Sequence, residues 1–318
     1  MRLLRATLWL CRCWPMIDLA ALIKDRLTHP RPMTINAHPE DMGMAILRQL
    51  TSGEAPGGKA ALRMSSLGKC ARALCYAVND VPENGRSIDG RSRATFAMGD
   101  ACEVLLSTAL ADSICATGWR MEGYREEGQI SIDWEVDGHS IMGHPDGVLF
   151  DPDGQKHLLE IKSASSYGFS KWQKALDNGQ EPWTPEESYW WQIQGYMAAL
   201  DVRQAYILTL CKDSGAIMGW WHKADPGFGP MLKRHLELAT NENPGMVPRQ
   251  LPCGTQLRPV RKLSKKTGNP LKGDGALPWQ CRYCNFYKTC HQGNLIEQVT
   301  RDYRGRPSTT LFLKEMEE

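Results

Sequence analysis

The stretch GHPDGVLFDPDGQKHLLEIKS, residues 143–163, has the pattern of a β-hairpin and decides the fold class. Its two apolar runs are separated by DPDG, residues 151–154. Proline suits the second position of a type I turn, and Gly154 suits the left-handed residue of a G1 bulge. A three-residue hairpin loop of this kind places Asp151 opposite Gln155, so it sets the pairing of the two strands.

Counting along these strands brings four polar residues to one face of the hairpin. Asp146 is expected opposite Glu160 and His144 opposite Lys162, and side chains alternate between the two faces of a strand. Directly opposed carboxylates repel each other and destabilise a sheet. A divalent cation would explain them, because Mg²⁺ is usually held by one or two carboxylates together with water and substrate phosphates. A solvated face that carries an ordinary Glu–Lys pair is the alternative.

The composition is that of an ordinary soluble globular protein, and it excludes several classes of function. With a net charge of only +2, a contact with nucleic acid has to come from a local basic surface. The sequence lacks the G-x-G-x-x-G and G-x-x-x-x-G-K-[ST] motifs, which argues against dinucleotide binding and against a P-loop motor. Residues 1–15 contain no convincing secretory signal or membrane span, so we expect a cytoplasmic protein without membrane contact.

The rest of the chain alternates between helical and strand patterns. Apolar spacing predicts four helices, over 65–78, 93–112, 185–202 (with Pro185 in its first turn) and 233–242. Strands are predicted over 129–136, 139–150 and 157–165, and a further hairpin over 205–222, turned at KDSG. This order predicts an α/β fold with a central mixed sheet flanked by helices.

Three cysteines near the end of the chain, in CRYCNFYKTC (281–290), are spaced C-x2-C-x5-C. In a reducing compartment, clustered cysteines bind metal more often than they form disulfides. A metal held by thiolates takes four ligands, and no fourth cysteine lies close by in the sequence. Tetrahedral thiolate ligation suits both zinc and an iron–sulphur cluster.

Four motifs flank or form the hairpin in a fixed order: Gly99-x3-Glu103, Pro145-Asp146, Glu160-x-Lys162 and Gln192-x3-Tyr196. The series resembles the PD-(D/E)xK nuclease superfamily in its RecB-like exonuclease branch. With the cysteines, the resemblance covers roughly residues 65–292, and it is similar to that of CRISPR-associated and phage-encoded exonucleases. Each motif is weak alone, whereas five in the right order are specific.

The resemblance implies a metal site on the hairpin. Glu103, Asp146 and Glu160 would hold one or two Mg²⁺ or Mn²⁺ ions, with the backbone carbonyl of Ile161 as a further ligand. Lys162 would position or activate the water that attacks the phosphodiester. Hydrolysis would then proceed in line, with the metal stabilising charge on the attacked phosphate.

The resemblance also implies contacts with DNA. Gln192 and Tyr196 would support the site and touch the DNA, whose single-stranded or double-stranded ends would be the substrate. His144 would contact the substrate phosphate or, alternatively, would be a plain structural histidine. A recombination or helicase protein that unwinds the DNA would be a separate chain.

In members of this branch that carry an iron–sulphur cluster, one cysteine ahead of the nuclease motifs joins the three C-terminal ones. Cys70 fits that place, because Arg72 and Tyr76 follow it as in the family's pattern. The resemblance therefore implies a 4Fe–4S cluster held by Cys70, Cys281, Cys284 and Cys290. Cys75 is an alternative to Cys70, and zinc is the alternative metal, held by the same thiolates or with His291 replacing one. The remaining cysteines, including Cys253, read as buried or incidental thiols.

We therefore expect a restriction-endonuclease-like core closed by a C-terminal cysteine region. Residues 1–60 are expected to form an N-terminal extension and linker, 61–250 the nuclease core, and 251–318 a basic loop followed by the iron–sulphur segment. The implied function is a metal-dependent DNA exonuclease in recombination, repair or phage DNA processing. The alternatives are a structure-selective endonuclease on the same core and a DNA-end-binding processing subunit.

Overall fold

The computed structural model describes residues 17–29, 62–84, 90–124, 129–254, 277–292, 295–301 and 307–313. The basic loop, whose most basic part is 258–273, lies largely outside these ranges. In chain order, the elements are α1 (Leu19–Thr28), β1 (Leu62–Arg63), the 3-10 helix η1 (Met64–Ser66), α3 (Ala71–Val78), α4 (Gly90–Ile114), β2 (Arg120–Glu122), β3 (Ile132–Val136), β4 (His139–Gly143), β5 (Gly147–Phe150), β6 (Lys156–Ala164), α5 (Ser166–Asp177), α6 (Ser188–Leu200), β7 (Gln204–Cys211), β8 (Ile217–Lys223), α7 (Phe228–Ala239), the 3-10 helix η3 (Pro244–Met246), α8 (Trp279–Arg282), α9 (Tyr287–His291), β9 (Leu295–Arg301) and β10 (Pro307–Leu313).

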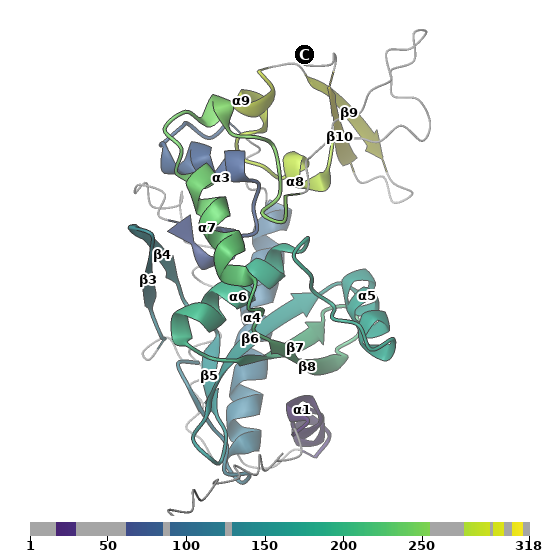
Figure 1. Cartoon of the computed structure of the whole chain (residues 1–318). Coiled ribbons are helices and arrows are strands. Elements are labelled where there is room, and N and C mark those ends of the chain that lie inside the picture. Colours follow the sequence, from purple (N-terminus) through teal and green to yellow (C-terminus); the bar gives the residue numbers. More distant parts are fainter. Residues whose placement is uncertain are drawn as a thin grey trace, which may run out of the picture.

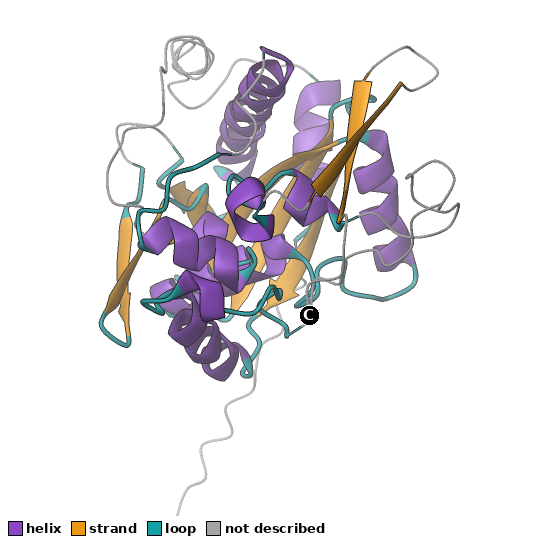
Figure 2. Cartoon of the chain, turned by 90° about the horizontal axis from the view of Figure 1, so that it is seen from above, coloured by secondary structure: helices purple, strands orange, loops and turns teal. Residues whose placement is uncertain are grey.

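A five-stranded mixed sheet in the order β2-β5-β6-β7-β8 forms the centre of the molecule. β6 and β7 run parallel, and the other neighbouring strands run antiparallel. Helices α1 and α4 cover one face of the sheet, while α5 and α6 cover the other (Figure 1). Seen from above, helices lie on both sides of the strands (Figure 2). The expected α/β fold with a central mixed sheet flanked by helices is confirmed.

Alternate residues of the central strands supply one core on each face of the sheet. Leu159 and Ile23 are fully buried in the core under α1 and α4, whereas Leu158 and Trp191 are fully buried under α6. Part of the segment 1–60 thus packs into the body of the fold. Among the described helices, α4 alone is long and apolar enough, by length and composition, to cross a membrane. It packs against α1, β6 and β7, as a core helix does.

The β5–β6 hairpin has the predicted pairing. Gly147 lies opposite Leu159, and Phe150 lies opposite Lys156. Gly154 has a φ of +80°, and its N–H donates to the carbonyl oxygen of Asp151 over 2.9 Å. The local chemistry of the turn was therefore sufficient to predict the register of the hairpin, and the prediction is confirmed.

The strand expected over 139–150 is in fact two strands in two sheets, so this expectation was wrong. β4 pairs with β1 and β3 in a separate three-stranded sheet, whereas β5 belongs to the central sheet. The break falls between Gly143 and Gly147, where Pro145 has no N–H to donate to a ladder. His144 therefore lies outside the strands and does not pair with Lys162.

Several helices also differ from expectation. α3 begins at Ala71 rather than at Ser65, and α7 spans Phe228–Ala239 rather than 233–242. α6 begins at Ser188 rather than at Pro185, because the backbone of Glu187 is still extended. The carbonyl of Pro185 accepts instead from the indole N–H of Trp191, over 2.9 Å. α5, which connects β6 to the loop before α6, was not predicted. Trp183 and Trp191 are at most 1% exposed and pack in the core.

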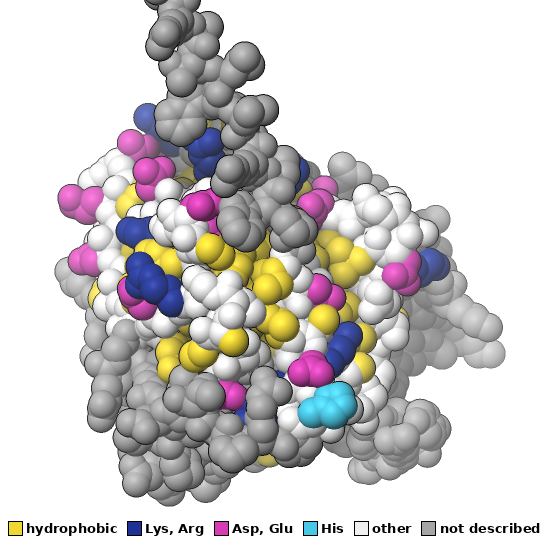
Figure 3. All heavy atoms as spheres, turned by 90° about the horizontal axis from the view of Figure 1, so that it is seen from below, with side chains coloured by type: hydrophobic (Ala, Val, Ile, Leu, Met, Phe, Trp, Pro, Cys, Tyr) yellow, Lys and Arg dark blue, Asp and Glu magenta, His cyan; other side chains and the backbone are white. Residues whose placement is uncertain are grey.

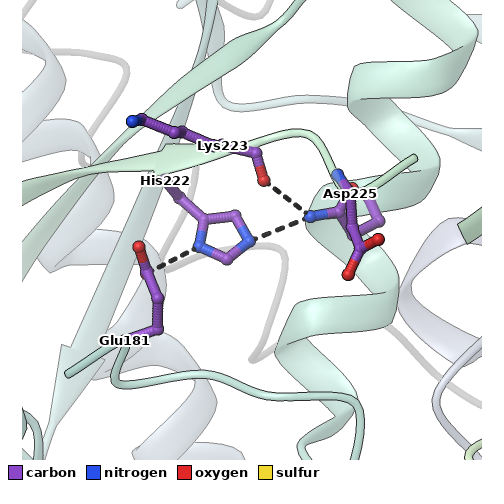
Figure 4. Close-up of polar contacts among 5 residues, drawn as sticks. Glu181, His222, Lys223 and Asp225 are labelled. Atoms are coloured by element: carbon purple, nitrogen blue, oxygen red, sulfur yellow. Dashed lines mark hydrogen bonds and ion pairs between the residues drawn. The ribbon is translucent and has the colours of Figure 1, made fainter. Parts of the chain in front are cut away.

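A buried polar network ties α6 to β8 and to the loop before α6 (Figure 4). Gln194 donates from Nε2 to the carbonyl of Lys223 over 2.9 Å, and its Oε1 accepts from the N–H of Asp225 over 2.9 Å. These bonds orient the amide so that Nε2 also faces Nε2 of His222 at 3.1 Å. His222 is therefore the acceptor there and carries its proton on Nδ1, 3.1 Å from Oε2 of Glu181. The network fixes the helix that bears the Gln-x3-Tyr motif.

Candidate active site

Asp146 defines the open end of the β5–β6 hairpin. The ladder between the two strands ends at the pair Gly147–Leu159, so β5 pairs with none of the β6 residues beyond Leu159. The carboxylate of Asp146 occupies the place of the missing strand, because its Oδ2 accepts from the N–H of Ile161 at 2.6 Å. Burial raises the pKa of Asp146, although the charge of Lys162 and this hydrogen bond oppose the rise.

Glu160 and Lys162 follow on β6 and form an ion pair. The side chain of Glu160 is fully buried, and its Oε2 has no hydrogen-bond partner among the described residues. Burial, opposed by Lys162 and reinforced by Asp146, raises the pKa of Glu160 to about 7. Burial alone would lower the pKa of Lys162, but the charges of Glu160 and Asp146 outweigh it, so this pKa is raised.

Glu103 reaches the same point from α4, which covers the opposite face of the sheet. Burial and then the charge of Asp146 raise the pKa of Glu103 to about 8, with Glu160 adding to the rise and Lys162 opposing it. α4 passes close to β6 here, since a methyl group added at Gly99 would lie 3.7 Å from Oγ of Ser163. The structure thus brings the three predicted carboxyl groups and the predicted lysine into one electrostatic cluster.

Tyr196 holds the chain just before Asp146. Its hydroxyl donates to the carbonyl of His144 over 2.9 Å and accepts from the N–H of the same residue over 3.0 Å. Burial and the charges of Glu160 and Asp146 raise the pKa of this hydroxyl, so it stays protonated and can donate. A Cβ at Gly143 would lie 2.8 Å from the hydroxyl oxygen, so glycine is needed there for the close approach.

The α6 face toward the site carries two more polar side chains. The ring of Tyr189 lies 5.4 Å from Nζ of Lys162, within the range of a cation–π contact. Gln192 lies between Tyr189 and Tyr196 at helical spacing, and it is half-buried. Sequence reasoning predicted Gln192 and Tyr196, whereas it did not assign Tyr189 to Lys162. The only signal for Tyr189 was its place one turn ahead of Gln192.

The four cysteines of the predicted cluster come from opposite ends of the described core. Cys70 caps the start of α3, Cys281 lies in α8, and Cys290 lies in α9. Burial and then the charges of Cys70, Cys290 and Cys284 raise the pKa of Cys281 to about 12. Burial also raises the pKa of Cys284, to about 11, with Cys290 and Cys70 contributing. The four thiols are therefore near enough to influence one another.

The alternative ligands lie differently. Cys75 is buried in another apolar cluster, with Ala71 and Val247, and its Sγ lies 3.0 Å from the carbonyl oxygen of Asn241, to which it donates. His291 is buried at the end of α9. Cys253, which we expected to be incidental, packs in the same apolar cluster as Cys70, Cys281 and Cys284. No sequence spacing pointed to Cys253.

Both residue sets fit a metal by their chemistry. Oxygen donors with raised pKa values, including the unpartnered Oε2 of Glu160, suit a hard divalent cation. Four mutually interacting thiols suit zinc or an iron–sulphur cluster. Within the described ranges, no three His, Cys, Asp or Glu side chains are already arranged as a metal cage. Protein groups hold several of the donors instead, as Lys162 pairs with Glu160.

No family model and no curated protein matches the chain. Among solved structures, SSO0001 matches with a TM-score of 0.40 at 14% identity, over 78% of this chain and 93% of that chain. LHK-Exo in complex with dAMP, an alkaline exonuclease from Laribacter hongkongensis, matches with a TM-score of 0.37 at 16% identity, over 57% and 86%. A phage-related exonuclease from Haemophilus somnus matches with a TM-score of 0.34 at 14% identity, over 57% and 93%. These likenesses are too distant to decide function.

Proposed function

We propose that this chain is a metal-dependent deoxyribonuclease that degrades DNA from an end. The observation that supports it is the convergence of Glu103, Asp146 and Glu160 around Lys162, where the hairpin ladder stops. Burying three like charges together costs stability, and proteins arrange perturbed carboxyl groups in this way mainly at functional sites. A solvated Glu–Lys pair, the alternative considered from the sequence, does not fit a fully buried Glu160.

The site residues have separate roles in this proposal. Glu103, Asp146 and Glu160, with the carbonyl of Ile161, would hold Mg²⁺ or Mn²⁺. When bound, such a cation polarises a phosphoryl oxygen and lowers the pKa of a bound water. The ammonium group of Lys162 adds positive charge where negative charge grows on the attacked phosphate.

The neighbours of these residues keep the acidic groups in place. Ile161 fixes the carboxylate of Asp146 through its N–H, and Tyr196 fixes the backbone of His144 two residues earlier. Glu103 and Glu160 lie on packed elements, and Asp146 is held by the N–H of Ile161, so these carboxyl groups need little reorganisation when the substrate arrives. His144, whose exposed side chain lies two residues ahead of Asp146, would contact a substrate phosphate in this proposal.

The DNA contact has to be local. In the face of the molecule seen from below, basic and acidic side chains are interspersed around apolar ones (Figure 3). The described residues on that face therefore offer no continuous basic stretch for a phosphate backbone. We place the DNA at the hairpin end instead, where Lys162 lies by the ring of Tyr189 and Gln192 follows Tyr189 by three residues on α6.

The four-cysteine site is structural in this proposal. Cys70, Cys281, Cys284 and Cys290 would hold a 4Fe–4S cluster, with zinc as the alternative. The rings of Tyr76 and Phe286 lie 5.5 Å apart beside it and join α3 to the segment before α9. Metal binding would add to the free energy of folding by tying the two ends of the core together.

The decisive experiment uses end-labelled DNA. Linear single-stranded and double-stranded DNA, labelled at the 5′ or the 3′ end, is incubated with the purified chain with and without Mg²⁺ or Mn²⁺. We expect metal-dependent loss of linear substrate, whereas circular single-stranded DNA of the same sequence is spared. Cleavage of the circle would favour the endonuclease alternative. Binding to ends without cleavage at any metal concentration would favour the end-binding alternative.

A further inference from the structure

The segment that follows η3, residues 247–251, lies between the two halves of the four-cysteine site. On the Cys70 side, the N–H of Ala71 donates to the carbonyl of Gln250 over 3.1 Å. Arg72 donates from Nε to the carbonyl of Val247 over 2.5 Å on the same side. On the other side, Arg249 donates from Nε to Sγ of Cys290 over 3.3 Å. The segment therefore bridges residues that are far apart in the sequence.

Arg249 donates two hydrogen bonds to Cys290. Besides the bond to Sγ, its Nη2 donates to the carbonyl oxygen of Cys290 over 2.8 Å. The planar guanidinium makes such paired contacts in a fixed geometry, which the point charge of a lysine cannot reproduce. One side chain thus orients the thiol of Cys290 and holds the backbone of the same residue.

We propose that Arg249 is a positioning residue of the metal site, which sets how firmly the four thiolates hold their metal. The inference rests on the metal site proposed above, but it does not depend on nuclease activity. Four thiolates carry more negative charge than zinc or a 4Fe–4S core neutralises, so a neighbouring cation stabilises the loaded site. Partners that hydrogen-bond to a metal ligand orient that ligand, and their removal typically weakens metal binding roughly 10- to 100-fold.

Arg72 offers a matched control, because it also anchors this segment but donates to backbone carbonyl groups. Its Nε and Nη2 donate to the carbonyl oxygens of Val247 and Gly245. Arg249→Gln removes the cation and the bond to sulphur, whereas Arg72→Gln removes a cation that supports the backbone of this segment and the side chain of Tyr76. Arg249→Lys keeps the positive charge but lacks the planar guanidinium that makes both bonds. It provides a second test if Arg249→Gln does not fold.

The experiment measures metal retention in the anaerobically purified full chain. Iron and zinc per chain are determined first, and the rate at which excess chelator removes the metal is then followed. We expect Arg249→Gln to lose metal roughly tenfold faster than the wild type, and Arg249→Lys to lie between them. Arg72→Gln should lose metal at close to the wild-type rate, even if it lowers the unfolding temperature.

A second readout separates an effect on the metal from an effect on folding. If the metal is iron, Arg249→Gln should have a more negative midpoint potential, because the guanidinium charge no longer offsets the charge of the electron added on reduction. If it is zinc, the cobalt-substituted variant should show a shifted thiolate-to-metal charge-transfer band. Wild-type retention together with a wild-type potential or band in Arg249→Gln would overturn the proposal. So would equal losses in Arg249→Gln and Arg72→Gln, or a wild-type chain that binds neither metal.

Discussion

The carboxylate of Asp146 accepts a hydrogen bond from the backbone N–H of Ile161 at 2.6 Å, at the point where the β5–β6 ladder has already ended. The side chain of Asp146 therefore accepts a hydrogen bond that a neighbouring strand would otherwise accept. It satisfies a backbone donor that would otherwise be unpaired, and it places a negative charge next to Glu160 and Glu103. The same residue is therefore both a structural support and a proposed metal ligand, and the two roles can be separated by substitution.

Asp146→Asn should abolish most of the activity while the protein remains as stable as the wild type. The amide keeps an oxygen that can accept from Ile161, but it is a poor ligand for a hard cation. Asp146→Ala should also lose activity, and it should lower the free energy of unfolding by about 1–3 kcal/mol, because the N–H of Ile161 loses its partner. Nuclease assays over a range of Mg²⁺ concentrations and urea denaturation measure both effects. An Asn variant with the wild-type dependence on Mg²⁺ would contradict the ligand assignment.

The metal-free protein should become less stable as the pH rises from about 5 to about 8. The pKa values of Glu160, about 7, and Glu103, about 8, lie above the usual value for glutamate, so the folded state binds more protons than the unfolded state in this window. Stability is therefore fully present below the unfolded pKa and is lost as the pH passes the folded values. Urea denaturation without added divalent cation, at several pH values, measures this slope.

The matched control for this pH dependence is Glu103→Gln, which should flatten the slope by removing one of the two titrations. Added Mg²⁺ should act in the opposite direction, stabilising the protein more at pH 8 than at pH 6, because its ligands must be deprotonated. A slope that is the same in Glu103→Gln as in the wild type would show that Glu103 does not titrate in this window.

Gly143→Ala should impair the site although it adds only a methyl group. The new Cβ would lie 2.8 Å from the hydroxyl oxygen of Tyr196 and 2.7 Å from Cγ of Met64, so Tyr196 would have to leave His144. We expect the free energy of unfolding to fall by about 1–3 kcal/mol, because buried hydrogen-bonding groups lose their partner. Activity should fall as well. Gly229→Ala, where a Cβ meets nothing within 4 Å, should leave activity unchanged. Equal activity in the two variants would argue that Tyr196 does not support Asp146.

Much of this site could be predicted because its determinants are local. The turn chemistry of Asp151 to Gly154 was enough to predict the register of the β5–β6 hairpin. The expected strand pairing of Asp146 with Glu160 does not form, because the ladder ends at Gly147 and Leu159, but Asp146 still lies close enough to raise the pKa of Glu160. The division of residues 139–150 between two sheets was not predicted, because the apolar pattern runs through both strands. Only Pro145 indicated the break, and a single proline does not reveal which sheet the next strand joins.

The remaining features depend on packing between segments that are distant in the sequence. Tyr189 meets Lys162 only because α6 crosses β6, and Cys253 joins the thiols only because the segment after α7 returns to α3. α5 was missed although Phe169, Trp172 and Leu176 follow one another at helical spacing and pack into the core. Arg249 has no motif at all, and its bond to Cys290 is visible only in the fold.

Gln194→Leu should be among the most destabilising changes on α6. It would leave the N–H of Asp225 and the carbonyl of Lys223 without their present partner, and it would deprive His222 of its donor. At about 1–3 kcal/mol for each unpaired buried group, we expect a loss of at least about 3 kcal/mol in the free energy of unfolding. Glu181→Gln should cost much less, because the side chain of Glu181 is 52% exposed. Urea denaturation of both variants tests the ranking, and equal losses would contradict it.

Cys70→Ser should remove metal from the chain as completely as Cys284→Ser, although Cys70 lies more than 200 residues away in the sequence. The charge of Cys70 raises the pKa of both Cys281 and Cys284, so its thiol lies close to theirs. Cys75→Ser is the matched control, because Cys75 donates to the carbonyl of Asn241 and serine can make the same bond. The metal content of anaerobic preparations and the unfolding temperature are the measurements.

We expect about four irons per chain in the wild type and in Cys75→Ser, and loss of iron, colour and stability in Cys70→Ser. Nuclease activity should fall with stability in Cys70→Ser, because the two ends of the core are no longer joined by the metal. One zinc per chain with no iron would change the identity of the metal and keep the four-cysteine site. Full iron in Cys70→Ser would instead remove Cys70 from the ligand set, and Cys253, which packs in the same cluster, would be the next residue to substitute.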